Sequence, residues 1–178
     1  MTKISEKNYA FIDGQNLHMG TLSSEVPWKI DLQRFRVYLA EKYNVTKAYY
    51  YLGFTHTDYN SLYRNIQEAG FILEFRKHTL AMRGEKKGNV DTEIVFEIMR
   101  KLYKKEHFGK IVLVSGDGDF RMLVDFLIAE GRFQKILFPN KHFASSLYRS
   151  LHAKFFSFLE DEGTRRKISW TQKKKGYP

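Results

Sequence analysis

Three short stretches of the chain place carboxylates next to glycine or asparagine, in patterns suited to binding a cation. The clearest is the Ser-Gly-Asp-Gly-Asp loop from Ser115 to Asp119, which directly follows four apolar residues, Ile111 to Val114. A buried strand that runs into a glycine-containing turn and then a helix presents the turn's side chains at the carboxyl end of the strand. Ligands bind at that edge of open α/β sheets. Because Asp is also a common turn residue and helix cap, this loop alone is equally compatible with a structural turn.

Two further stretches repeat the arrangement and favour the cation site. Asp13 follows the apolar run Tyr9 to Ile12, and Asp91 ends the sequence Lys-Gly-Asn-Val-Asp at the start of an expected helix. Carboxylates gathered at one sheet edge repel one another unless a cation is bound or some are protonated, and hard oxygen ligands favour Mg²⁺ or Mn²⁺ over zinc. We therefore predict a metal site with Asp13, Asp91 and Asp117 as ligands. Such an ion can activate a water for attack on a phosphodiester.

Three more residues are candidates for supporting roles. Asp119 either acts as a fourth catalytic acid, by holding a metal through water or orienting the nucleophile, or only caps the following helix. Asn16 either positions the scissile phosphate or a ligand carboxylate, or bonds its own loop. Lys87 lies in a basic segment that leads to Asp91, and we predict that it contacts a substrate phosphate, although such runs are usually solvated surface.

The elements that must position these residues alternate between strand and helix, which predicts an α/β fold with a mostly parallel central sheet in three α/β/α layers. Apolar runs predict strands at 9–12, 48–52, 71–75, 111–114, 135–138 and 155–158. Apolar periodicity predicts helices at 31–43, 57–69, 91–105, after the acidic loop up to Gly131, and at 144–151. The segment 15–29 has no clear period and contains Pro27, so we expect a loop with at most a helical turn.

Composition bounds the class of protein. A length of 178 residues with 43% hydrophobic content suits one domain, expected over 1–160, followed by a basic, flexible tail at 161–178 outside the compact core. The chain has no cysteine, which excludes disulfides and thiolate metal sites and fits a cytoplasmic protein. It has no apolar run long enough to span a membrane. The net charge of +10 favours an anionic partner such as a nucleic acid.

Taken together, Phe-Ile-Asp-Gly-Gln-Asn at 11–16, Lys-Gly-Asn-Val-Asp at 87–91 and Ser-Gly-Asp-Gly-Asp-Phe at 115–120 resemble the three motifs of the NYN domain, the LabA group of the PIN-like nuclease superfamily. The resemblance covers Asn8 to Leu159. It implies a PIN-like fold and a Mg²⁺- or Mn²⁺-dependent ribonuclease site. The family's acidic residues correspond to Asp13, Asp91, Asp117 and Asp119. Asn16 and Ser115 are supporting positions, which with Lys87 make up the predicted substrate-binding set.

One position departs from the family pattern. Members often carry an Asp six residues after the Asp of the second motif, where this chain has Glu97. Six residues correspond to about 600° of helical rotation, so Glu97 does not share the helix face of Asp91. We expect a solvated Glu97 paired with Lys101, outside the site.

Three functions fit these residues to different degrees. The favoured one is a ribonuclease that hydrolyses RNA phosphodiester bonds with metal-activated water. The alternative is a catalytically weak RNA-binding or regulatory module on the same fold. A phosphatase of the haloacid dehalogenase type is disfavoured, because its nucleophile pattern needs an Asp where this chain has Gln15. The expected partners are RNA and, in a homo-oligomer, further copies of the chain.

Overall fold

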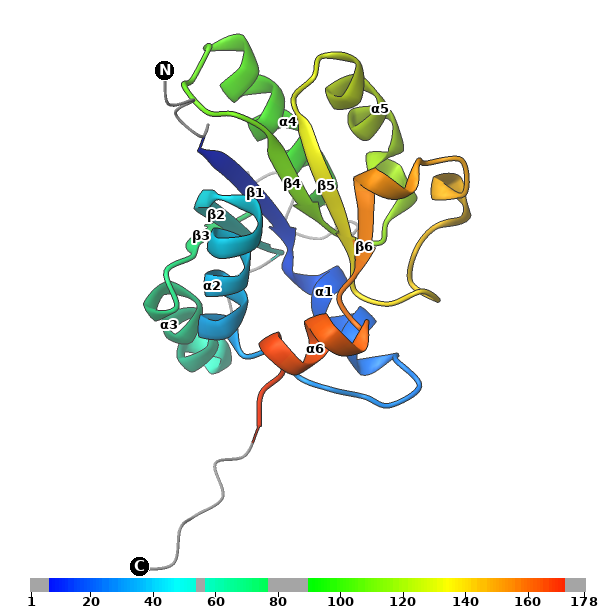
Figure 1. Cartoon of the computed structure of the whole chain (residues 1–178). Helices are drawn as coiled ribbons and strands as arrows, with labels where there is room; N and C mark the ends of the chain where they lie inside the picture. The colour runs from blue at the N-terminus through cyan, green and yellow to red at the C-terminus, as the bar shows by residue number, and fades with distance from the viewer. Residues whose placement is uncertain (1–6, 54–56, 77–89, 172–178) are drawn as a thin grey trace, which may run out of the picture.

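A parallel six-stranded sheet forms the centre of the molecule (Figure 1). The computed structural model describes residues 7–53, 57–76 and 90–171. The strands are β1 (Asn8–Asp13), β2 (Val45–Leu52), β3 (Ile72–Phe75), β4 (Ile111–Val114), β5 (Phe133–Phe138) and β6 (Phe156–Phe158). They lie in the order β3-β2-β1-β4-β5-β6, and every neighbouring pair is parallel. All six predicted strands are confirmed.

Helices cover both faces of this sheet. They are α1 (Gly14–Leu22), α2 (Leu32–Tyr43), α3 (Asn60–Glu68), α4 (Val90–Tyr103), α5 (Arg121–Ala129) and α6 (Glu162–Ile168). Strand β1 supplies alternate side chains to two apolar cores. Ala10 and Ile12 pack in the core of α1, α2, α3 and α6, whereas Phe11 packs in the core of α4 and α5. The predicted three-layer α/β/α fold is confirmed.

Helix α1 occupies the first part of the segment 15–29, where a loop was expected. Its sequence lacks an apolar stripe because Leu17 is its one large apolar side chain in the core, while Met19 and Leu22 are exposed. The helix is instead held at close range by small residues. Gly20 lies so near Pro139 that a Cβ at this position would collide with the proline ring. The prediction of a loop was wrong for 15–22, because periodicity does not detect a helix packed through glycine, and it is confirmed for 23–29.

The prediction of a helix at 144–151 was also wrong. This segment contains only a single 3₁₀ turn, Ser146–Tyr148, and Ser145 caps it by accepting a hydrogen bond from the Leu147 N–H. The backbone N–H of Ser145 itself donates to the carbonyl of Gly116 in the acidic loop, at 2.9 Å. The segment is therefore shaped by its contact with that loop rather than by its own helical periodicity.

The expectation that 161–178 lies outside the compact core is wrong for α6. Ile168 is completely buried in the core that α2 shares with the sheet, and Ser169 forms a bridge with Ile30. Trp170 donates its N–H to the carbonyl of Lys29 at 2.8 Å. Residues 172–178 lie outside the described residues. Within the described residues, no helix has both the length and the apolar character needed to cross a membrane.

Candidate metal centre

The acidic loop lies where the chain reverses its direction of progress across the sheet. Strands β1, β2 and β3 follow one another toward one edge, and β4, β5 and β6 toward the other, so β1 and β4 are neighbours. Ile12 of β1 is in register with Val114 of β4, which brings Asp13 level with Ser115 at the carboxyl ends of these strands. In α/β sheets this switch point leaves a crevice in which ligands bind.

Local hydrogen bonds fix the two aspartates of the loop. The Asp117 carboxylate accepts a hydrogen bond from the Asp119 N–H at 3.0 Å and thereby caps the 3₁₀ turn Gly118–Phe120. Phe120 is completely buried and anchors the start of α5. The loop is consequently attached to the core at both ends, by β4 and by Phe120, while the Asp119 side of the turn is exposed.

The segment 143–148 packs directly on this loop. Tyr148 donates its hydroxyl hydrogen to the Asp117 carbonyl at 2.7 Å. A Cβ at Gly116 would collide with the Phe143 carbonyl, and one at Gly118 would collide with Ser145. The glycines are needed for this close approach rather than for backbone conformation, since neither has a positive φ. No sequence pattern identified Tyr148, because its contact joins residues 31 positions apart.

Asp13 ends β1 and is 6% exposed. Its carboxylate accepts a hydrogen bond from the Asn16 N–H at 3.0 Å, as the N-cap of α1, and its second oxygen lies 3.5 Å from the Ser115 hydroxyl. Burial raises the pKa of the Asp13 carboxyl, the hydrogen bond from Asn16 opposes the rise, and the charge of Asp117 adds to it. The pKa of Asp13 therefore depends on the charge of the acidic loop.

Asn16 and Ser115 connect the two acidic strand ends. The Asn16 side-chain oxygen accepts a hydrogen bond from the Gly116 N–H at 2.8 Å, so this side chain binds the neighbouring loop rather than its own. Ser115 accepts from the Asp117 N–H at 3.1 Å and is completely buried. Complete burial is incompatible with the predicted substrate contact of Ser115, whose position is that of a support for Asp13 and Asp117.

Three carboxylates from two elements form the candidate metal centre. Asp91 lies in the first turn of α4, and one of its oxygens, with one each from Asp117 and Asp119, belongs to a group whose members all lie within 4.8 Å of one another. These are hard oxygen donors at a spacing that one small divalent cation can draw together, so the residues fit Mg²⁺ or Mn²⁺. Two of the three predicted ligands are thus brought together, with Asp119 in the third place. The assignment of Asp13 as a ligand stays a prediction.

The structure contradicts the predicted pairing of Glu97, and it does not describe Lys87. Glu97 pairs with Arg100 at 2.6 Å, whereas Lys101 pairs with Glu106 at 3.3 Å, so the expected Glu97 to Lys101 pair was wrong. The reason is that the Lys101 side chain is buried over the Tyr49 ring, where its ammonium group pairs with Glu106. Lys87 and most of the basic segment lie outside the described residues, and its contact with phosphate stays a prediction.

Comparisons with known proteins agree with the geometry. The family model described as the NYN domain matches residues 8–160. The low amplitude and bright protein LabA of Synechococcus elongatus is 28% identical, over 67% of this chain and 67% of the relative. A crystal structure of a protein of unknown function from Vibrio parahaemolyticus has the same fold, with a TM-score of 0.73 at 20% identity over 96% of this chain and 99% of that chain. The resemblance seen in the three motifs is confirmed: the chain belongs to the NYN domain family, within the PIN-like nuclease superfamily.

Proposed function

We propose that this protein is a divalent-metal-dependent ribonuclease. The observation that carries the proposal is the convergence of Asp91, Asp117 and Asp119 at the switch point of the sheet, in a chain that belongs to a nuclease superfamily. The net charge of +10 supports an RNA substrate, because a basic protein attracts a polyanion even though this site is itself acidic.

Each carboxylate has a role that its position supports. Asp91 and Asp117 would hold the ion, and Asp119, the exposed member of the cluster, would complete its shell or orient the attacking water. A bound Mg²⁺ or Mn²⁺ supplies charge to polarise the phosphoryl oxygen and acidify a water. Asp13 would add its charge from the buried side of the site, where burial raises its pKa and a bound cation would lower it.

Three residues around the carboxylates position the acidic loop, and Asn16 stays a predicted contact of the substrate. Ser115 holds the Asp117 backbone, Asn16 holds Gly116, and Tyr148 holds the Asp117 carbonyl. Pre-organised ligands reduce the cost of assembling a charged site when substrate binds. Lys87 is proposed to contact a phosphate next to the cleaved bond.

The test is cleavage of labelled single-stranded RNA with Mg²⁺, with Mn²⁺ and with a chelator. We expect activity with either metal and none with the chelator. Asp117→Asn should lower the rate by about a hundredfold or more, because it removes a metal-ligand charge while keeping the shape of the side chain. Glu130→Gln is the matched control, since Glu130 is exposed after α5 and its loss removes the same charge elsewhere.

Two results would contradict the proposal. Full activity of a folded Asp117→Asn variant would remove the acidic cluster from the reaction. RNA binding by the wild type without cleavage under either metal would instead favour the catalytically weak RNA-binding module.

A further inference from the structure

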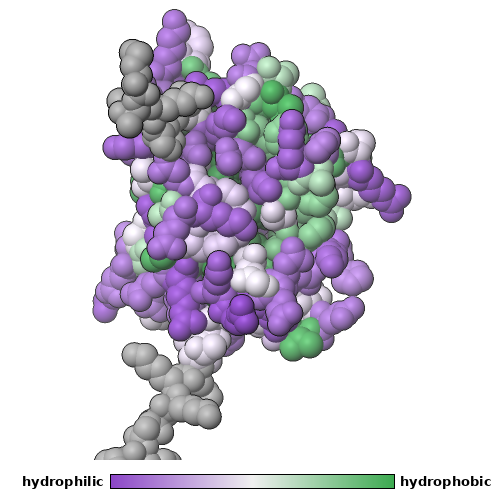
Figure 2. Space-filling model, in the orientation of Figure 1, coloured by the Kyte–Doolittle hydropathy of each residue, from purple (hydrophilic) through white to green (hydrophobic). Residues whose placement is uncertain are grey.

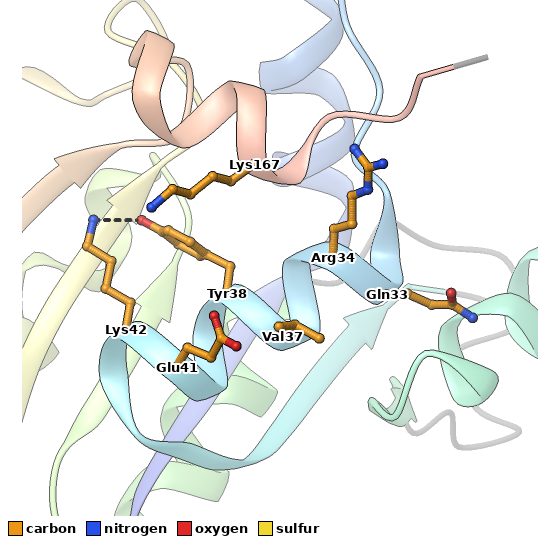
Figure 3. Close-up of a pocket in the computed structure, with 7 residues that line it drawn as sticks. All are labelled: Gln33, Arg34, Val37, Tyr38, Glu41, Lys42 and Lys167. Atoms are coloured by element: carbon orange, nitrogen blue, oxygen red, sulfur yellow. Dashed lines mark hydrogen bonds between the residues drawn. The ribbon is translucent and has the colours of Figure 1, made fainter. Parts of the chain in front are cut away.

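An open groove of about 690 Å³ runs between α2 and α6, and we call it the α2–α6 groove. It lies in the helical layer that packs on the sheet opposite α4 and α5, where Figure 2 shows a mainly hydrophilic surface in the orientation of Figure 1. Its lining residues are Gln33, Arg34, Val37, Tyr38, Glu41, Lys42 and Lys167 (Figure 3). Pockets of this size are typical of small-molecule sites.

The charges of the groove are strongly unbalanced. Lys42 from α2 and Lys167 from α6 both point toward the Tyr38 hydroxyl in Figure 3, and Glu41 is the one carboxylate in the lining. Among the residues that the structure describes, neither lysine forms an ion pair. Two converging ammonium groups, with Glu41 as the one carboxylate in the lining, give the groove a positive potential.

Tyr38 and Lys42, which line the groove, belong to a polar network that continues beneath the lining. Tyr38 is buried, and its hydroxyl accepts a hydrogen bond from Lys42 at 3.0 Å and lies 3.5 Å from the hydroxyl of Tyr43. The Lys135 ammonium donates to the Ser157 hydroxyl at 3.3 Å. Burial lowers the pKa of Lys135, and the positive charge of Lys42 lowers it further, so these two cations repel each other across the network.

We propose that the α2–α6 groove binds a phosphoryl group, carried either by an RNA strand or by a small phosphorylated compound such as a nucleotide. A phosphate would be an ion-pair partner for Lys42 and Lys167, and its oxygens accept hydrogen bonds from ammonium groups. The exposed Val37 and the apolar stems of the lysines leave surface for an attached sugar or base. This site is separate from the acidic cluster and does not rest on the proposed cleavage.

The test is binding of inorganic phosphate and of a short single-stranded RNA, each followed by NMR with the protein in chelator. Chelation keeps the acidic cluster free of metal, so the result is independent of nuclease activity. We expect both titrations to shift the amide signals of Tyr38, Lys42 and Lys167. The double variant Lys42→Gln/Lys167→Gln should weaken phosphate binding by about tenfold or more. The control is the double variant Lys104→Gln/Lys110→Gln, which removes two exposed lysines outside the groove. It should leave the affinity for phosphate unchanged.

The two titrations distinguish the sources of the phosphate. If the groove variant weakens binding of RNA and phosphate alike, the site holds the RNA backbone. If it weakens binding of phosphate alone, the site holds a small phosphorylated compound. Absence of shifts at the groove in the wild type, or equal weakening by the control variant, would overturn the proposal.

Discussion

At the scale of single residues, the buried carboxyl group of Asp13 opposes folding when it is charged. Its carboxyl group is buried at the end of β1, and burial raises its pKa above the ordinary value. The folded state therefore holds the proton more tightly than the unfolded state. This contribution to stability is complete below the unfolded pKa near 4 and is lost as pH rises through the folded pKa. At neutral pH without metal, the Asp13 charge destabilises the fold.

Asp13→Asn should consequently stabilise the metal-free protein at pH 7, by roughly 1 kcal/mol in the free energy of unfolding. The amide oxygen can still accept the hydrogen bond from the Asn16 N–H that caps α1. As the pH falls toward 4 the gain should shrink, because the raised pKa lets the wild-type carboxyl take up its proton in the folded state. Urea denaturation in chelator at both pH values measures the difference.

Asp31→Asn is the matched control for this measurement. Asp31 caps α2 with the same type of hydrogen bond, to the Arg34 N–H at 3.0 Å, but its side chain is 27% exposed and lies beside the Arg34 guanidinium. This variant should show no gain at pH 7. An Asp13→Asn protein that is less stable than the wild type by the same amount at both pH values would contradict the account of buried charge.

At the scale of elements, the site depends on the contact between the acidic loop and the segment 143–148. Tyr148→Phe removes the hydrogen bond to the Asp117 carbonyl and leaves every metal ligand in place. We expect a loss of stability of about 1 kcal/mol and a several-fold weaker affinity for Mn²⁺, because the loop that carries two ligands is less firmly held. Titration with Mn²⁺ followed by electron paramagnetic resonance measures the affinity.

Tyr9→Phe provides the comparison for Tyr148→Phe. Tyr9 is similarly buried in the same core, but it lies near the start of β1, at the opposite end of the strand from Asp13, and its ring stacks on Phe108. Its variant should keep the wild-type affinity for Mn²⁺. If both variants bind Mn²⁺ equally well, the segment 143–148 has no influence on the metal centre.

The elements also show which sequence signals were informative. Strand β4 was predicted from a run of four apolar residues, all of them buried, and helix α4 from apolar residues at helical spacing, as Ile94 and Ile98 are. Helix α1 and the turn Ser146–Tyr148 were missed because glycine contacts and links to a distant loop hold them. Helix α6 was missed because one buried residue, Ile168, fixes it within a basic stretch whose composition is typical of a tail.

At the scale of the whole molecule, the site could be predicted only in part. The three acidic motifs were visible in the sequence, and the parallel alternation predicted that they share one edge of the sheet. The order of the strands in the sheet could not be predicted from the sequence. This order makes β1 and β4 neighbours and sets Asp13 beside Ser115. Which carboxylates meet also depends on side-chain directions, so Asp119 rather than Asp13 completes the closest group.

The charges of the molecule are separated, with carboxylates at the switch point and an excess of cations elsewhere that gives a net charge of +10. RNA binding measured in chelator should therefore be driven by the cations and weaken with salt, by about tenfold or more between roughly 50 and 200 mM, as expected when a few phosphates are contacted. Fluorescence anisotropy of labelled RNA over this range gives the slope. Asp117→Asn should bind RNA at least as tightly as the wild type in chelator, because it removes a negative charge that repels the phosphate backbone. Affinity independent of salt, or a loss of RNA binding in Asp117→Asn without metal, would show that electrostatic attraction to the basic surface does not bring RNA to this protein.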